Sequence, residues 1–337
     1  MTPFHKLLIL LALILWPADA LAERAAYTEG RLWIVDDHQL FSLAEHEKGS
    51  RPETFGEAVL SICVLDGDLV ALTAPSDNPQ AWSLHRRGNG AWIKQANISG
   101  AKSGLIALVC ADHGVVLLTQ RHIVTIKNGA VGQVVMQGEL TTGRPTVLGT
   151  SEFLYIGYDM GEWGGGLQAI SRADGRIHSI GKNATGDLCD GPLNAECDPV
   201  MGIVILPWKP ECLGLAVGLL HLSAHGRIVI ACDDGIETHY ARQFGERFPN
   251  QSIPEAEAYE TIPFFKLAVV ENNLVTLGMD GIYRIGADGN ATIIPLPKFK
   301  QIGQFKVSFE VPGVVLIAGE RGPDDSYYAY EMEMVAR

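Results

Sequence analysis

Short hydrophobic runs alternate with polar turns along almost the whole chain. Each run is rich in Val, Ile, Leu and aromatic residues, and it is followed by a polar turn, a second run and often a third. Runs of this length bounded by Gly, Asn, Asp and Pro are typical of β-strands, whereas helical periodicity is scarce. Residues 246–260 could hold a short helix, but their two prolines favour a loop. The pattern predicts an all-β protein.

The strand pattern repeats at a nearly constant spacing of about 47 residues. Seven units result when the following residues are taken as equivalent points: Leu32, Leu69, Val115, Leu154, Ala216, Leu274 and Val315. Several strands per unit at this period are typical of propeller blades, whereas a pair of β-sandwiches would not explain the spacing. The turns RGNG, KNG, RADG and GADGN fit hairpins, because Asn-Gly and Asp-Gly readily adopt positive φ.

The spacing predicts a single β-propeller over residues 23–337, with seven blades. Six blades are the alternative, because the long insertion at 182–212 could replace one. The C-terminal stretch SYYAYEMEM alternates with period two and reads as a strand with one buried side. We expect it to share a blade with the early strand RLWIVD, since this pairing would hide an exposed sheet edge.

The chain resembles the β-propeller superfamily as a whole, over nearly all of residues 23–337. The resemblance rests on the blade rhythm. The Trp-Asp dipeptide of WD40 repeats and a regular Kelch double-glycine pattern are absent. The resemblance therefore implies a fold and assigns no functional residue.

The first 22 residues have the pattern of a secretory signal peptide. Lys6 precedes ten apolar residues at 7–16, Pro17 ends the run, and Ala20-Leu21-Ala22 forms a cleavage site before Glu23. A membrane anchor is the alternative, but a spanning helix needs about 20 apolar residues. The sequence predicts a periplasmic or secreted protein without membrane insertion.

Charge narrows the choice of partners. The formal net charge is −13, which argues against nucleic acid and anionic lipid, because both favour basic surfaces. The charge permits a protein partner with a basic surface, although it also serves solubility alone. The 47% apolar content allows a large core and argues against disorder.

The six cysteines predict disulfides, as expected for an exported protein. Zinc is the rival, but no C-x-x-C pair occurs. A polar stretch with Gly and Pro separates Cys189 from Cys197, so this pair is favoured. Pairing Cys212 with Cys232 would staple the end of the insertion to a later strand, and Cys63 with Cys110 then remains, one repeat apart.

No catalytic motif is recognisable. The sequence has no G-x-S-x-G, H-E-x-x-H, P-loop or Rossmann pattern. His221 and His225 are four residues apart, but LLHLSAHGRI reads as strand, turn and strand, which would aim the rings differently. We expect no cofactor, with calcium as the metal left open by four acidic turns: Asp36-Asp37, Asp233-Asp234, Asp280-Gly281 and Asp324-Asp325. Turns favour Asp in any case.

The stretch YDMGEWGGGLQAISRADG at 158–175 is the candidate binding loop. Asp159, Glu162 and Trp163 precede Gly164, Gly165 and Gly166, between two predicted strands. A wide hairpin that needs room is the structural explanation. A partner-binding loop is the functional one, because Trp is enriched among interface hot spots. The insertion follows and carries Trp208, and we expect both segments to form one surface.

Three functions remain open. The first is a non-catalytic protein-binding propeller, in its sharpest form an immunity or inhibitor protein that neutralises a periplasm-acting toxin such as a lipase or cell-wall hydrolase. The second is a hydrolase or lyase that uses carboxylates of the central channel, with or without calcium. The third is a sensor of sugars or other ligands.

Overall fold

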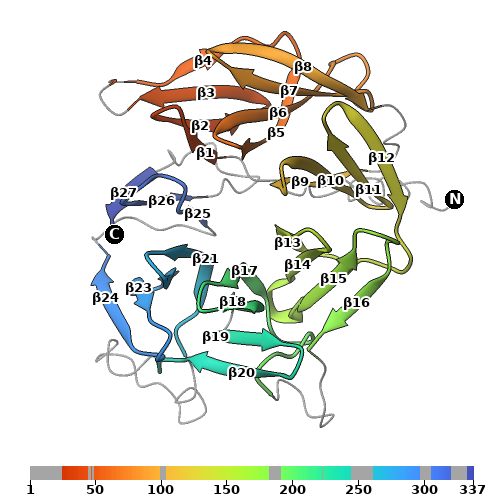
Figure 1. The fold of residues 1–337 in the computed structure, drawn as a ribbon. Coiled ribbons are helices and arrows are strands. Elements are labelled where there is room, and N and C mark those ends of the chain that lie inside the picture. The colour runs from red at the N-terminus through yellow and green to blue at the C-terminus, as the bar shows by residue number, and fades with distance from the viewer. Residues whose placement is uncertain are drawn as a thin grey trace, which may run out of the picture.

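Seven antiparallel sheets surround a common axis (Figure 1). The structure is a computed structural model that describes residues 25–44, 47, 49–98, 104–181, 191–221, 223–243, 261–296, 305–319 and 332–337. The all-β architecture and the count of seven blades are confirmed, so the insertion at 182–212 does not replace a blade. The described residues contain one 3-10 turn, η1 (Gly161–Trp163), and none of their helices is long and apolar enough to cross a membrane.

Consecutive strands pair within each blade, in sequence order from the first to the last. The first three blades are β1 (Ala25–Thr28), β2 (Arg31–Asp36), β3 (Gln39–Ala44), β4 (Arg51–Glu53); β5 (Ala58–Leu65), β6 (Asp68–Ala74), β7 (Trp82–Gly88), β8 (Ala91–Ile98); and β9 (Leu105–Ala111), β10 (Gly114–Thr119), β11 (His122–Lys127), β12 (Ala130–Val135). The next two are β13 (Arg144–Gly149), β14 (Phe153–Asp159), β15 (Leu167–Ser171), β16 (Ile177–Ile180); and β17 (Val200–Leu206), β18 (Lys209–His221), β19 (Ser223–Cys232), β20 (Gly235–Tyr240). The last two are β21 (Phe264–Val270), β22 (Asn273–Gly278), β23 (Gly281–Ile285), β24 (Ala291–Pro295); and β25 (Phe305–Ser308), β26 (Val314–Gly319), β27 (Met332–Ala336).

The second strand of every blade contains one of the seven residues taken as equivalent points in the sequence. These strands read as continuous apolar runs because both of their faces are buried. In β10, Val115 and Leu117 pack toward the second blade, whereas Val116 and Leu118 pack toward the fourth. Such a strand lies between two neighbouring blades, and its alternate side chains therefore pack against different blades.

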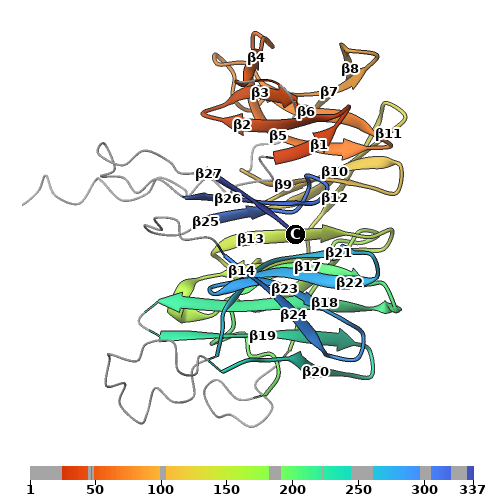
Figure 2. The ribbon, with the colours of Figure 1, turned by 90° about the vertical axis from the view of Figure 1, so that its left-hand side faces the viewer.

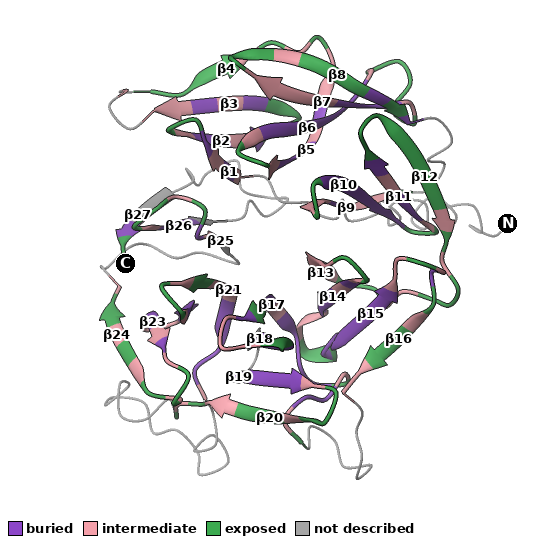
Figure 3. Cartoon of the chain, viewed as in Figure 1, coloured by how far each residue is buried: buried purple, intermediate pink, exposed green. Residues whose placement is uncertain are grey.

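The core is a series of hydrophobic clusters between consecutive blades, visible as buried segments in Figure 3. One cluster joins the first and second blades around the fully buried Trp33. Five further clusters join each following pair, up to the sixth and seventh blades. The ring is therefore stabilised by contacts between neighbours rather than by one central core.

Tight turns close the hairpins as the sequence predicts. Asn89 and Gly90 have φ of 51° and 78°, and Asn128 and Gly129 have the same pair of values. These positive angles match the right-handed twist of the flanking strands. Both Asn-Gly turns of the sequence are thus confirmed.

The terminal strands do not pair with each other in the described residues, which corrects the expected closure. β2, which contains RLWIVD, pairs with β1 and β3, and β27 pairs with β26. The first blade is already complete with its own four strands, so it has no strand to contribute to the seventh. Tyr328 and Tyr330 lie outside the described residues.

Two of the expected disulfides are confirmed. Cys63 and Cys110 join β5 to β9, the first strands of neighbouring blades, across 47 residues of sequence. Cys212 and Cys232 join β18 to β19 within one blade, with Cα atoms 4.5 Å apart. Cys197 is also disulfide-bonded. Its expected partner Cys189 lies outside the described residues, as do the signal peptide at 1–22, the stretch 246–260 and Asp324-Asp325.

Candidate protein-binding site

Trp163 lies at the surface, at the end of the turn η1 that connects β14 to β15. Its side chain is 71% exposed, so the indole does not pack into the core. A large apolar side chain this exposed contributes little to the packing of the ring. This exposure is the feature expected of an anchor for a partner.

The three glycines that follow Trp163 are needed because other backbone segments lie against them. A Cβ on Gly164 would come within 2.5 Å of the Ala195 carbonyl oxygen, and one on Gly165 within 2.2 Å of the Tyr158 carbonyl oxygen. Gly165 N–H donates to the Ala195 carbonyl at 2.9 Å, and Gly166 N–H donates to the Asp198 carbonyl at 2.9 Å. The glycines therefore join the loop to the described part of the insertion.

Asp159 supports the loop from below instead of facing solvent. Its side chain is 9% exposed and forms an ion pair with Arg144 on β13. The other carboxylate oxygen accepts a hydrogen bond from Gly161 N–H at 2.9 Å. The negative charge of Asp159 is thus compensated within the chain, and the residue fixes the start of η1.

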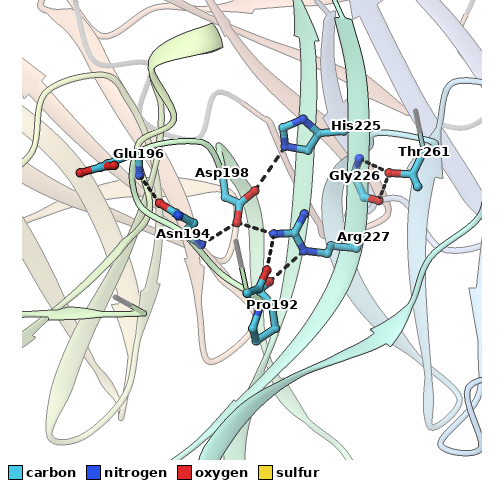
Figure 4. Close-up of polar contacts among 9 residues, drawn as sticks. Pro192, Asn194, Glu196, Asp198, His225, Gly226, Arg227 and Thr261 are labelled. Atoms are coloured by element: carbon cyan, nitrogen blue, oxygen red, sulfur yellow. Dashed lines mark hydrogen bonds and ion pairs between the residues drawn. The ribbon is translucent and has the colours of Figure 1, made fainter. Parts of the chain in front are cut away.

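Two exposed acidic residues belong to the Trp163 loop and to the segment that packs against it. Glu162 immediately precedes Trp163, and the backbone of Glu196 packs against Gly164. In Figure 4 the side chain of Glu196 points away from the polar cluster beneath it. The sequence did not single out Glu196, because it lies 33 positions after Trp163, in a polar stretch. The structure therefore adds a second exposed acid, next to the backbone of the loop.

Asp198 is the centre of a buried polar cluster under this surface (Figure 4). Its side chain is 1% exposed. Oδ2 accepts hydrogen bonds from Arg227 Nη2 at 2.6 Å and from Asn194 N–H at 2.6 Å, and Oδ1 lies 3.2 Å from Nε2 of His225. A buried carboxylate needs this number of donors to offset its lost hydration.

The cluster ties the insertion to the long β18–β19 hairpin. His225 and Arg227 both lie on β19, two residues apart and therefore on the same face. Arg227 also donates to the carbonyl oxygens of Pro192 at 2.8 Å and Gly191 at 3.2 Å. All of these hydrogen bonds from the Arg227 guanidinium have their acceptors in the insertion, so the cluster holds the insertion against β19.

The two histidines singled out in the sequence lie on different strands, as predicted. His221 ends β18, and His225 lies on β19 opposite Leu219. His225 shares its carboxylate with Arg227, so Asp198 is not a partner dedicated to a catalytic imidazole. In the described part of the chain, no group of three or more His, Cys, Asp or Glu side chains is placed to hold a metal ion.

Trp208 lies at the other end of β18 from the Trp163 loop. It occupies the β17–β18 turn, packs partly against the core and has its ring 5.8 Å from that of His239. The Asp198 cluster contacts β19 opposite Leu219, eleven residues further along β18, which corresponds to roughly 35 Å of extended strand. Figure 2 shows the two ends of this strand at opposite sides of the ring. The structure therefore does not bring Trp208 together with Trp163.

Comparison with known proteins identifies the fold and no closer relationship. No protein-family model matches the chain, and no curated protein matches it. Similar solved structures include the extracellular domain of the hybrid two component system BT4673 from B. thetaiotaomicron (TM-score 0.51, 12% identity, 90% of this chain but 37% of that chain). Others are the computationally designed Ika8 protein (TM-score 0.52, 11% identity, 88% and 82%) and a chain of the Mitotic Checkpoint Complex (TM-score 0.55, 10% identity, 89% and 85%). At these identities the likeness shows the fold alone, and the chain is a seven-bladed β-propeller.

Proposed function

We propose that the protein binds a protein partner through the Trp163 loop, without catalysis. The observation that carries this proposal is an indole that is 71% exposed on a backbone held by hydrogen bonds of the chain itself. Tryptophan is enriched among the residues that dominate binding energy. A loop that is already ordered loses little entropy when a partner binds.

The charges around the indole favour a partner with basic groups. Glu162 in the loop and Glu196 in the segment packed against it are both exposed, and the chain as a whole carries a net charge of −13. Such rim charges act mainly on the association rate and on its salt dependence. We expect Glu162→Gln and Glu196→Gln to slow association, with smaller effects at high salt.

The role we favour for this surface is that of an immunity or inhibitor protein. The partner would be a toxin that acts in the periplasm, such as a lipase or a cell-wall hydrolase. The two disulfides among the described residues are typical of proteins in an oxidising compartment. Periplasmic or secreted localisation, after removal of residues 1–22, is part of the same proposal.

Site-specific photo-crosslinking tests the proposal because it captures a partner of any identity. A photoreactive phenylalanine analogue replaces Trp163 in the producing cell, and the control places it at Ile93, an exposed residue on the outer strand β8. We expect one protein to crosslink at position 163 and not at position 93. The same products at both positions would count against a specific surface.

The captured protein then allows a quantitative test. Trp163→Ala should weaken its binding by about 2 kcal/mol, roughly 30-fold. The melting temperature should stay close to wild type, because the lost side chain leaves no core cavity. The wild-type protein should also inhibit the ester or cell-wall hydrolysis that the captured protein catalyses. Unchanged affinity in the folded variant would refute the binding role of Trp163, and binding without inhibition would refute the immunity role.

A further inference from the structure

The Trp163 loop has its main-chain support in a segment about 30 residues further along the chain. Gly165 and Gly166 donate their N–H groups to the carbonyls of Ala195 and Asp198. The loop also has local backbone hydrogen bonds: Gly164 N–H donates to the Gly161 carbonyl, and Met160 N–H donates to the Gly164 carbonyl. Asp159 fixes the start of the loop, and the position of its glycine end depends on where the segment 194–198 lies.

The Asp198 carboxylate connects the segment 194–198 to the neighbouring blade. Asp198 accepts from Asn194 N–H within its own segment, which closes a compact turn together with the bond from Asp198 N–H to the Asn194 carbonyl at 2.8 Å. Arg227 and His225 attach the same carboxylate to β19, which pairs with β18 and β20 in the fifth blade. Asp198 thus contacts the loop through its main chain and the blade through its side chain.

We infer that Asp198 is the positioning residue of the Trp163 loop, and that its carboxylate sets how rigidly the indole is presented. This inference deepens the proposed function and rests on it for its functional consequence. Without the carboxylate, the segment 194–198 loses its direct side-chain bonds to β19, and the carbonyls that accept from the two glycine N–H groups are held less firmly. The loop then samples more conformations, and a partner must order it on binding.

A second buried acid provides a matched control. Asp280 is largely buried in the sixth blade and pairs with Arg242 at 3.0 Å, with a further bond from the Tyr283 hydroxyl at 2.6 Å. Asp280→Asn likewise removes a largely buried charge from an arginine partner, here a more exposed one. It leaves the segment 194–198 and the Trp163 loop unchanged, so it reports the general effect of a lost ion pair on stability.

Hydrogen exchange of the free protein separates positioning from general stability. We expect Asp198→Asn to accelerate amide exchange in residues 161–166 by about tenfold or more, with β10 unchanged. Asp280→Asn should leave residues 161–166 at the wild-type rate. Equal exchange of 161–166 in the two variants would overturn the inference. If Asp198→Asn does not fold, Arg227→Lys is measured against Arg242→Lys with the same expectation, since the lysine ammonium lacks the planar fork with which arginine reaches several acceptors at once.

The functional consequence is measured by crosslinking from position 163 in each variant background. The yield should fall in Asp198→Asn and stay unchanged in Asp280→Asn. A mobile loop with an unchanged yield would overturn the role in binding. A wild-type protein that captures no partner would refute the proposed function, while accelerated exchange of 161–166 would still establish Asp198 as the residue that orders the loop.

Discussion

The backbone of Ala195 lies so close to Gly164 that a Cβ on Gly164 would meet its carbonyl oxygen at 2.5 Å. Gly164 also has φ of 76° and ψ of −120°, a combination available almost only to glycine. Gly164 and Ala195 are far apart in the sequence, yet each restricts the other. The glycine is required by the contact, and the contact places the Trp163 loop on the insertion.

Replacing Gly164 by Ala should therefore destabilise the protein by about 3 kcal/mol. Gly161→Ala is the matched control, because Gly161 has φ of 62° but no atom of the described residues within 4 Å of an added Cβ. The control should cost only the strain of a positive φ, about 1 kcal/mol. Urea denaturation of both variants gives the difference. Equal losses would show that the crowding at Gly164 has no energetic effect.

Two buried tyrosines should respond oppositely to loss of the hydroxyl. Among the described residues the Tyr158 hydroxyl has no hydrogen-bond partner, and burial raises the pKa of Tyr158 above its ordinary value. Tyr158→Phe should leave stability unchanged or raise it by up to about 1 kcal/mol. The Tyr283 hydroxyl bonds to Asp280 and Arg242, so Tyr283→Phe should cost about 2 kcal/mol. Thermal unfolding measures both, and a loss at Tyr158 as large as at Tyr283 would contradict the assignment of partners.

His85 should make the protein less stable in mild acid. Burial against Phe55 and its neighbours holds the pKa of His85 below its ordinary value of 6.5, although Glu57 opposes the shift. The unfolded chain then binds a proton that the folded chain resists, so stability is full above the unfolded pKa and declines as the pH falls through it. Between about pH 7.5 and about pH 5.5, the free energy of unfolding should fall more in wild type than in His85→Phe. Parallel pH profiles for the two proteins would rule this out.

The disulfide between the second and third blades should contribute strongly to stability. Cys63 and Cys110 close a loop of 47 residues, and replacing both by Ala should lower the free energy of unfolding by about 4 kcal/mol. The same change at Cys212 and Cys232, which are 20 residues apart, should cost about 3 kcal/mol. Chemical denaturation under oxidising conditions provides both values. If the Cys63–Cys110 disulfide can be removed without loss of stability, the hydrophobic cluster between the two blades is enough to hold them together.

The blade count was predictable because each blade has one strand buried on both faces. Such a strand reads as an uninterrupted apolar run, and Leu69 in β6 or Val115 in β10 therefore stands out at a constant spacing. The closure was not predictable. Nothing in the sequence reveals that β1 to β4 already form a complete blade, which leaves β27 to pair with β26 alone among the described strands.

The candidate site was predictable only in part. The sequence marks Trp163 and its glycines as unusual, but it cannot show which backbone occupies the space beside them. In the sequence, Asp198 looks like one more acid in a polar stretch. Only the three-dimensional structure reveals that it is buried and that side chains of β19 bind its carboxylate. Trp163 and Trp208 lie apart because the length of β18 separates Trp208 from the Trp163 loop. The spacing of the two residues along the chain does not reveal this separation.

The alternation along β10 restricts where this protein can change during evolution. Inserting one residue into that strand would exchange Val115 with Val116, and every later side chain, between two different interfaces. Changes of length are therefore tolerated in the connections and not in the strands. The Trp163 loop and the insertion are such connections, so a change in their length would leave the strands of the ring in register.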